Sequence, residues 1–338
     1  MYTPPFTVTE KTLHLVSEIS EQVGRLNTRI NSDVPSPMLR KKNQIRTIHS
    51  SLAIENNTLT LEQVTDIIEG KHVLGAPDEI QEVKNAIEAY RLMSQVDAFK
   101  EKDLLMVHRL MMSQLIRNAG HYRQEGVGVF DGSGNCIHMA PPASQVPHLM
   151  SNLFGWVRNC KTHPLIYSCV FHYEFEFIHP FMDGNGRMGR YWQTVLLRRW
   201  KGLFGWLPVE TIVKEHQQDY YNVIARCDRE GESTMFVEFM LECLLRTMED
   251  YEDIDEDDTS GLHDKLHDKL HDKFPEMSEK SIAVLDVIKS YSGLNASEIG
   301  EHVGLSERQV KTYITKLKEL GLIERVGSNK TGYWKVLL

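Results

Sequence analysis

Cysteine is scarce in this sequence and is not arranged for a metal or a disulfide framework. The five cysteines are odd in number, and none of them falls in a C-x-x-C pair. This spacing argues against a zinc ribbon and against a secreted domain held together by disulfides. The sequence therefore predicts a soluble protein of a reducing compartment, which we take to be the cytoplasm.

Long apolar runs and targeting segments are also missing. The longest apolar stretch, near Trp192–Leu197, is interrupted at once by two arginines, well short of the roughly 18 residues that a membrane span needs. The first residues lack a basic segment followed by an apolar one, so we expect no signal peptide and no membrane partner. The absence of a G-x-x-x-x-G-K-S/T motif disfavours a P-loop NTPase or a conventional kinase.

Basic residues are fewer than acidic ones, 38 against 47, which gives the 338-residue chain a formal net charge of −9. An acidic balance is unusual for a protein coated with nucleic acid. The excess is concentrated, however, because residues 249–258 carry eight acids and no base. The overall charge therefore says little about what the rest of the chain binds.

Composition and periodicity divide the chain into four regions. Hydrophobic residues make up 41% and charged residues 25%, which is typical of globular domains, and the length predicts two or three of them. We expect an N-terminal helical region over 1–103, a helical domain over 104–248, a linker over 249–277 and a small domain over 278–338. Within the linker, Leu-His-Asp-Lys occurs three times. A solvated spacer is the favoured interpretation of this repeat, and a metal site made of its three histidines is the alternative.

The fold is expected to be mainly α. Apolar residues recur at spacings of three and four from Lys11 to about Met248, which is the period of amphipathic helices. The exception is the segment 127–139, where apolar residues alternate around the turn Asp131–Gly134. Such alternation about a glycine-containing turn predicts a β-hairpin.

The last 61 residues have the pattern of a winged helix-turn-helix domain. Three helical patterns are followed by two strand patterns: Ser281–Tyr291, Asn295–Val303, Glu307–Leu320, Leu322–Val326 and Tyr333–Leu337. Nine basic against seven acidic residues over 278–338 give a thin positive excess. DNA binding through the third helix and a protein-recognition or dimerisation role are both left open.

The stretch Ile178–Arg190, IHPFMDGNGRMGR, carries the chemistry. Pro180 ends an apolar helix, and the glycine-rich turn 183–186 leads into a new one. Such a turn directs several backbone N–H groups and the positive end of the helix dipole at one point, which makes an anion site suited to phosphates. Arg187 and Arg190, three residues apart, lie on one face and can reach the same anion.

Two further side chains of this stretch fit phosphate chemistry. Asp183 would repel a bare phosphate, so its presence suggests a Mg²⁺ ion between carboxylate and phosphate. His179, at the exit of the preceding helix, is placed to take a proton from an attacking hydroxyl.

These residues resemble the signature of the Fic (Fido) family, H-P-F-x-D/E-G-N-G-R-x-x-R, at every defined position. Gly120–Arg123 is similar to the G-x-Y-R element of that family, and the hairpin at 127–139 lies where its flap belongs. The resemblance implies a Fic-fold helical bundle with a β-hairpin flap, followed by the winged helix-turn-helix domain. It also implies an enzyme that transfers AMP from ATP to a hydroxyl side chain of a target protein and releases pyrophosphate. A DNA-binding transcriptional regulator with a Fic sensor or effector domain is the alternative function.

The resemblance assigns a role to each matching residue. His179 is the general base, and Asp183 is the ligand of Mg²⁺. The phosphates of ATP fall to the glycine-rich turn and the two arginines: Gly184, Asn185 and Gly186 cradle the α- and β-phosphates, Arg187 supports them, and Arg190 holds the γ-phosphate. Tyr220 and Tyr221 flank the adenine, Asp228 stands where relatives often have asparagine, and the target protein is bound along the flap.

An inhibitory element is predicted upstream, because Ser51–Asn56 resembles the S/T-x-x-x-E-G/N motif of the same family. Ser36 and Pro37 are suited to start a helix that Asn56 would end, with Glu55 in its last turn. Glutamate is unfavourable there because it faces the negative end of the helix dipole. The resemblance implies that Glu55 pairs with Arg190 and inhibits the enzyme within one chain. Removal of AMP from a modified protein, transfer of another phosphate-containing group, and a homodimer remain open expectations.

Overall fold

The chain is described here by a computed structural model that covers residues 2–29, 37–130, 136–250, 279–290, 294–303, 305–326 and 333–336. It divides into two compact units, Met1–Glu252 and Asp253–Leu338. The Leu-His-Asp-Lys repeat and most of the predicted linker lie outside the described residues, as do the hairpin turn at 131–134, the wing turn at 327–330 and Ser36.

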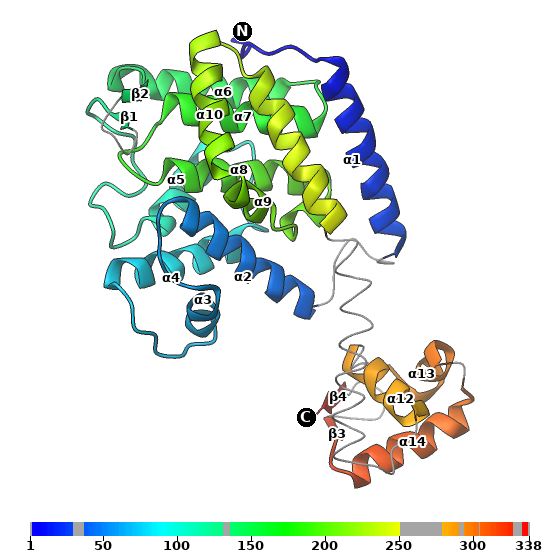
Figure 1. Ribbon diagram of the computed structural model, residues 1–338. Helices are drawn as coiled ribbons and strands as arrows, with labels where there is room; N and C mark the ends of the chain where they lie inside the picture. Colours follow the sequence, from blue (N-terminus) through cyan, green and yellow to red (C-terminus); the bar gives the residue numbers. More distant parts are fainter. Residues whose placement is uncertain are drawn as a thin grey trace. The chain divides into compact units, whose positions relative to one another are not determined.

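The first unit is built from helices, and its short strands form a single hairpin among the described residues (Figure 1). In chain order its elements are α1 (Glu10–Arg29), α2 (Pro37–Ile54), α3 (Leu61–Ile68), α4 (Pro77–Leu92), α5 (Glu101–Met111), β1 (Gly128–Phe130), β2 (Cys136–Met139), η1 (Ala143–Gln145), α6 (Val146–Asn159), α7 (Pro164–Ile178), α8 (Asn185–Trp200), η2 (Gly202–Gly205), α9 (Val209–Glu215) and α10 (Gln217–Glu230). Residues 234–250 form a further helix.

The helix pair α7 and α8 forms the centre of this unit. α7 is apolar on almost every side and nearly all its residues are buried, as its sequence predicts. Large side chains of α8, among them Tyr191 and Trp192, are fully buried against it and its neighbours. The two helices are joined by the 179–184 turn, so the predicted site is attached to the two most deeply buried helices of the unit.

The helices α2, α3 and α4 share a second, smaller apolar core. Ile45, Ile48 and Leu52 of α2 pack there with residues of α3 and α4, whereas Ile54 at the end of α2 belongs to the main core. A capping box starts α3: the Thr60 side chain accepts from the Gln63 backbone, and the Gln63 side chain accepts from the Thr60 backbone.

The predicted hairpin is confirmed as the antiparallel pair β1 and β2. Gly128 lies opposite Met139, and Val129 lies opposite His138. The register then shifts, because Phe130 lies opposite Cys136, so the strands contain a bulge that the alternating pattern does not reveal.

The second unit contains the predicted three helices and hairpin. They are α12 (Glu279–Ser290), α13 (Ala296–Val303), α14 (Glu307–Glu319), β3 (Ile323–Val326) and β4 (Tyr333–Val336). Ser306 is the N-cap of α14 in a capping box with Gln309. Among the described residues of this unit, nine buried apolar side chains form its own core: Val284, Leu285, Ile288, Ile299, Val310, Ile314, Leu317, Leu322 and Ile323.

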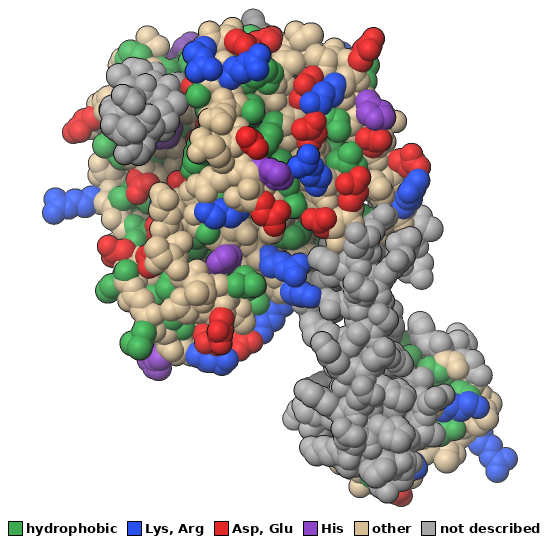
Figure 2. Space-filling view, viewed as in Figure 1, with side chains coloured by type: hydrophobic (Ala, Val, Ile, Leu, Met, Phe, Trp, Pro, Cys, Tyr) green, Lys and Arg blue, Asp and Glu red, His purple; other side chains and the backbone are tan. Residues whose placement is uncertain are grey.

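The surface gives no sign of a membrane-spanning element. Over the described ranges, every helix is either too short or too polar to cross a bilayer. Figure 2 shows acidic and basic side chains interspersed over the visible face of the first unit, which is the usual surface of a globular domain.

Candidate active site

His179 follows α7 directly and has a left-handed backbone conformation, with φ 48° and ψ 60°. This conformation is costly for a residue with a Cβ and persists only where the surroundings enforce it. Its backbone N–H still donates to Phe175 O at 2.9 Å, so the turn is anchored to the helix. The Pro180 that follows cannot extend α7. The imidazole is therefore presented from a fixed point at the end of a buried helix.

Arg123 holds the backbone on both sides of His179. Its buried guanidinium donates from Nε to His179 O at 2.8 Å, from Nη1 to Glu125 O at 2.9 Å, and from Nη2 to Pro141 O. The Arg123 backbone N–H donates to Pro180 O at 2.9 Å. One side chain thus ties the end of α7 to both ends of the flap, which gives a structural reason for the arginine of the Gly120–Arg123 element.

The glycine-rich turn and the helix start predicted within residues 183–187 are both present. α8 begins at Asn185, and Gly184 before it has φ 83°, a conformation that favours glycine. A side chain at position 184 would also collide with Met112. The first N–H groups of a helix have no partner within it, so those of Asn185, Gly186 and Arg187 point out of the start of α8 toward a potential anion.

The side chain of Asn185 is used differently from the prediction. Its Oδ1 accepts from the Phe181 N–H at 2.9 Å, and its Nδ2 donates to Phe181 O at 2.9 Å. The amide therefore closes the 181–185 loop on itself. Asn185 therefore contributes its backbone N–H to the anion cradle, the set of N–H donors of residues 185–187 at the start of α8. Its side chain fixes the shape of the loop before the helix.

Asp183 projects into solvent at the rim of the cradle, with 59% of its side chain exposed. Its Oδ1 accepts from the Gly184 N–H at 2.6 Å and lies 3.3 Å from Arg187 Nη2. These contacts orient the carboxylate and engage one of its oxygens. An exposed carboxylate beside an anion cradle is a chemically reasonable ligand for a divalent cation.

His108 of α5 fixes the backbone of Asp183. Its Nδ1 accepts from the Gly120 N–H at 2.8 Å, so the ring proton is on Nε2, which faces Asp183 O at 3.0 Å. The imidazole stacks on Phe181, with ring centroids 3.5 Å apart. Burial lowers the pKa of His108 to about 4, which keeps the ring neutral as this pair of hydrogen bonds requires.

Arg187 is held in an ion-pair chain rather than pointing freely into the cradle. Its Nη1 donates to Glu82 Oε1 at 2.8 Å, and Asn57 Nδ2 donates to the second oxygen of Glu82 at 2.8 Å. Together with Asp183, Glu82 balances much of the charge of Arg187. Arg187 thus links α4 to the turn and is suited to a supporting role.

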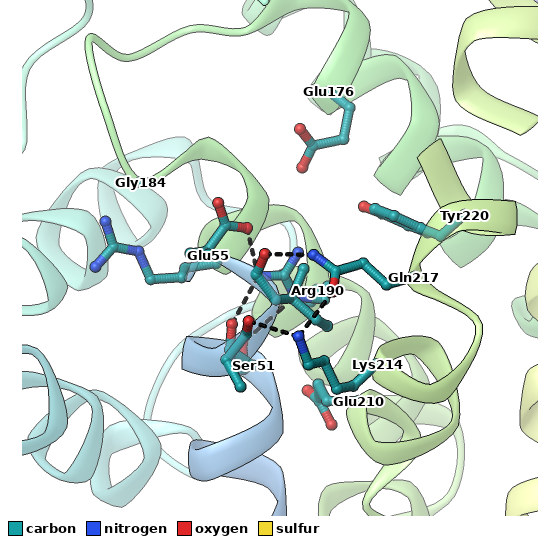
Figure 3. Close-up of polar contacts among 12 residues, drawn as sticks. Ser51, Glu55, Glu176, Gly184, Arg190, Glu210, Lys214, Gln217 and Tyr220 are labelled. Atoms are coloured by element: carbon teal, nitrogen blue, oxygen red, sulfur yellow. Dashed lines mark hydrogen bonds and ion pairs between the residues drawn. The ribbon is translucent and has the colours of Figure 1, made fainter. Parts of the chain in front are cut away.

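Arg190 and Glu55 meet at the predicted position, across 135 residues of sequence (Figure 3). Arg190 Nη2 donates to Glu55 Oε1 at 2.7 Å and to Ser51 O at 3.0 Å, while Nε lies 3.4 Å from Ser51 Oγ. A Cβ added to Gly186 would collide with the Glu55 carboxylate, which places that carboxylate directly over the first turn of α8. The cradle therefore faces an anion supplied by the chain itself.

The charge of Arg190 is stabilised although the side chain is only 3% exposed. Burial alone would lower the pKa of Arg190, but Glu55 and the nearby tyrosines outweigh it and the pKa is raised. Arg190 Nη1 is buried without a hydrogen-bond partner among the described residues. That donor remains available to another anion beside Gly186.

The last turn of α2 positions Glu55. Asn56 has φ 67°, its N–H donates to Ala53 O at 3.2 Å, and the Asn57 N–H donates to Leu52 O at 3.1 Å. This is a Schellman-type ending in which Glu55 is the cap residue. The helix end predicted at Asn56 is confirmed, and Glu55 lies just beyond the last helical residue, Ile54.

The three residues expected around the adenine lie on α10 and differ in accessibility. Tyr220 is 1% exposed and its hydroxyl lies 3.2 Å from His172 Nε2. Tyr221 is half-buried and donates to Ile54 O at 3.3 Å. Asp228 accepts from the Tyr173 hydroxyl at 2.8 Å. Of the two tyrosines, Tyr221 thus has the surface that a ligand could contact, and its hydroxyl reaches the last residue of the helix that carries Glu55.

The structure gathers the 179–190 residues with Ser51 and Glu55 around the start of α8. Sequence reasoning misses the residues that hold this arrangement, notably His108, Glu82, Lys214 and Gln217. No local pattern marks these residues, because their partners are supplied by other elements.

The second unit has a polar face of its own on α14. Arg308, Lys311, Thr312 and Thr315 are exposed along it and border a shallow groove with Glu307. This spacing of three and four residues places them on the solvent face of the predicted recognition helix. Lys311 is engaged with Glu307 at 2.6 Å, and Lys318 lies over the ring of Trp334, so the available positive charge is small.

Comparison with known proteins agrees with both sites. Residues 98–197 match the Fic/DOC family, and residues 277–324 match the winged helix-turn-helix DNA-binding family. The crystal structure of a Fic family protein from Desulfovibrio desulfuricans G20 is 43% identical, with a TM-score of 0.74 over 99% of this chain and 98% of that one. Fic-1 from C. elegans, 21% identical with a TM-score of 0.57, covers 73% of this chain and 76% of its own and shares the fold.

Curated relatives carry a more specific description. The protein adenylyltransferase Fic of Culex quinquefasciatus is 32% identical over 253 residues, and that of Aedes aegypti is 30% identical over 253 residues. Each alignment covers 70% of this chain and 48% of the relative. The chain thus spans about half the length of the curated relatives it matches.

Proposed function

The chain belongs to the Fic family, and from this membership we propose that it is a protein adenylyltransferase that transfers AMP from ATP to a hydroxyl side chain of a target protein. The observation that carries the proposal is the placement of the Glu55 carboxylate over Gly186, bonded to Arg190. An anionic group already lies at the start of α8, where helix N–H groups and a buried guanidinium converge. A nucleotide phosphate is the ligand best suited to the same place.

In the proposed reaction the target hydroxyl attacks the α-phosphorus of ATP. A bond forms between the hydroxyl oxygen and phosphorus, the bond from phosphorus to the β-phosphate bridging oxygen breaks, and pyrophosphate leaves. His179 accepts the hydroxyl proton. Because Arg123 fixes the backbone at His179, the point from which the imidazole projects is set before substrate binds, and positioning supplies much of the acceleration.

Magnesium fits the donor set at the rim of the cradle. Asp183 offers an exposed carboxylate whose Oδ1 is oriented by the Gly184 N–H and Arg187. Mg²⁺ typically binds one or two carboxylates together with substrate phosphates and water, so a single aspartate is sufficient. When bound with ATP, the ion would neutralise charge that develops on the phosphates.

Glu55 is proposed to inhibit the enzyme within the same chain. It occupies the hydrogen-bonding edge of Arg190 that would otherwise bind the γ-phosphate, so ATP would bind in an unproductive pose. The same carboxylate is near enough to the cradle to orient a water, and the proposal therefore includes removal of AMP as a second outcome at this site.

The target segment is proposed to bind along the flap. β1 and β2 form a two-stranded sheet, and such a sheet offers an edge to which an extended peptide can add by main-chain hydrogen bonds. This mode would place a target hydroxyl with little dependence on the neighbouring side chains.

Transfer of label from α-labelled ATP with Mg²⁺ to protein tests the proposal. Glu55→Gly should label itself or added cell proteins, and His179→Ala should abolish labelling in that background. His148→Ala, which removes an exposed histidine of α6, serves as the matched control and should label normally. Labelling that persists after His179→Ala would overturn the assignment.

A second activity, DNA binding by the second unit, is favoured by the winged helix-turn-helix match and by the exposed face of α14. Mobility shift of the full chain on genomic DNA fragments tests it. Binding should weaken steeply with salt and decrease when Arg308 is replaced by alanine. No retardation of any fragment by the wild-type chain would favour a protein-recognition role instead.

We also propose a cytoplasmic location. The four described cysteines, Cys160, Cys169, Cys227 and Cys243, are unpaired thiols. Thiols in this state suit a reducing compartment.

A further inference from the structure

The end of α2 needs donors from outside the helix. The last carbonyl groups of any helix have no partner within it, and the Schellman-type ending satisfies those of Leu52 and Ala53. The carbonyls of Ser51 and Ile54 are then served from other elements, and that of Ala53 accepts a further donor. All of these contacts come from side chains of α8, α9 and α10, which we call the catalytic body.

Two adjacent side chains of the catalytic body carry most of this role (Figure 3). Lys214 of α9 donates from Nζ to Ala53 O at 2.8 Å, and Gln217 of α10 donates from Nε2 to Ile54 O at 2.8 Å. Arg190 reaches Ser51 O one turn earlier. The last turn of α2 is thus held by side-chain donors from three other helices, α8, α9 and α10.

Lys214 and Gln217 also fix each other. Lys214 Nζ donates to Gln217 Oε1 at 2.7 Å. An ammonium can only donate, so this contact assigns the oxygen of the Gln217 amide to the lysine and directs its NH₂ group toward Ile54 O. The two residues form a single clasp with one arrangement of donors and acceptors.

Apolar packing and hydrogen bonds both place this turn, because Ile54, the last residue of α2, is fully buried in the main core. Among the described residues of α2, Ile54 alone belongs to the main core, whereas Ile45, Ile48 and Leu52 pack in the separate α2–α4 core. Side chains of α8, α9 and α10 add hydrogen bonds to the carbonyl groups of this turn, so its position depends on these bonds as well as on the burial of Ile54.

The charges around the end of α2 also favour these contacts. Glu55 adds a negative charge just beyond a helix C-terminus, where the macrodipole is already negative. The ammonium of Lys214 at the Ala53 carbonyl offsets that field from one side, and Arg190 offsets it from the other. Without Lys214, the turn that carries Glu55 would lose a hydrogen bond and a compensating charge together.

From this geometry we propose that Lys214 and Gln217 are positioning residues for the inhibitory glutamate, which hold Glu55 over the anion cradle by clasping the last carbonyls of α2. The expected rise in activity rests on the proposed function, whereas the expected loosening of the end of α2 does not. Opening of the clasp frees the end of α2 and withdraws Glu55 from Arg190, so the enzyme becomes active without any change at Glu55.

The experiment compares full-length Lys214→Met and Gln217→Met with wild type and with Glu55→Gly. Hydrogen exchange of peptides covering residues 50–60 should be about five- to tenfold faster in Lys214→Met, which removes a charged donor from the helix end, and should also be faster in Gln217→Met, which removes a neutral one. Self-labelling from α-labelled ATP should rise by a similar factor. Lys84→Met, which removes an exposed lysine of α4, is the matched control and should behave as wild type in both measurements.

Two further variants separate positioning from general destabilisation. Lys214→Arg keeps a cationic donor and should restore slow exchange. In the Glu55→Gly background, Lys214→Met should add nothing to labelling, because the residue acts through Glu55. Unchanged exchange over residues 50–60 in Lys214→Met, or a further rise in labelling on top of Glu55→Gly, would overturn the proposal. If Glu55→Gly itself transfers no AMP, the proposed function fails, while the exchange measurement still decides the clasp.

Discussion

The carboxylate of Glu55 lies in the space that a side chain on residue 186 would need. Gly186 is in the first turn of α8, so the absence of a Cβ there keeps the helix N–H groups open to an anion. The same opening admits either Glu55 or a phosphate. In the proposed function, the inhibitory carboxylate and the nucleotide phosphate would therefore compete for the space beside Gly186.

Gly186→Ala is expected to abolish AMP transfer in the Glu55→Gly background. The added methyl group would stand between the N–H groups and the phosphates, even though the inhibitory side chain is gone. Label transfer from α-labelled ATP measures the effect. Gly155→Ala in α6, where a Cβ meets no atom within 4 Å, is the matched control and should retain full labelling. An active Gly186→Ala double variant would show that the phosphates bind elsewhere.

Glu55→Gly should lower the free energy of unfolding by about 1–2 kcal/mol. It removes a charge-assisted hydrogen bond whose acceptor is 32% exposed, so the loss is smaller than for a fully buried pair. Thermal melting with and without Mg-ATP provides the measurement, and nucleotide should raise the melting temperature more in the variant than in wild type. An equal rise in both proteins would mean that Glu55 does not restrict binding to Arg190.

His108→Ala should raise the Mg²⁺ concentration needed for half-maximal AMP transfer and lower the rate about 10- to 100-fold in the Glu55→Gly background. His108 holds the backbone of the proposed metal ligand, and loss of such outer contacts has effects of this size. Initial rates over a Mg²⁺ series measure it. His121→Ala changes an exposed histidine next to Gly120 and should leave the dependence of the rate on Mg²⁺ concentration unchanged.

Glu210→Gln should become more stable relative to wild type as pH rises. Burial raises the pKa of Glu210 from about 4.5 to about 7, with Arg190 and the Tyr90 hydroxyl acting in the opposite direction. Between these values the folded protein binds a proton that the unfolded chain does not, so wild-type stability falls with increasing pH. The variant lacks this loss, and its advantage should grow by about 2 kcal/mol between pH 5 and pH 8. Denaturant unfolding at both pH values, with the exposed Glu215→Gln as control, tests this.

The sequence is most informative where the interactions are local. The end of α7 shortly before Pro180 and the start of a new helix after the glycine-rich turn are both predicted from neighbouring residues, and the structure confirms them. The catalytic stretch is predictable for the same reason, since His179 to Arg190 fall within twelve residues.

Contacts between distant elements are not predictable from periodicity. The pairing of Glu55 with Arg190 is expected from family resemblance alone, because 135 residues separate them. His108 and Glu82 give no signal in sequence, since each looks like an ordinary residue of an amphipathic helix. Asn185 shows the reverse error: its residue type suits an anion site, yet its side chain is engaged by the loop backbone.

The left-handed backbone conformation at His179 lowers the stability of the fold, whereas the proposed reaction needs a histidine at this position. Asparagine and glycine adopt this conformation more readily than histidine, so His179→Asn should be inactive and yet unfold less easily. Selection for thermal stability alone would thus favour replacements, such as asparagine, that remove the proposed base. In the proposed function His179 keeps this strained position for its chemistry, and a population freed from the need for that chemistry should lose it early.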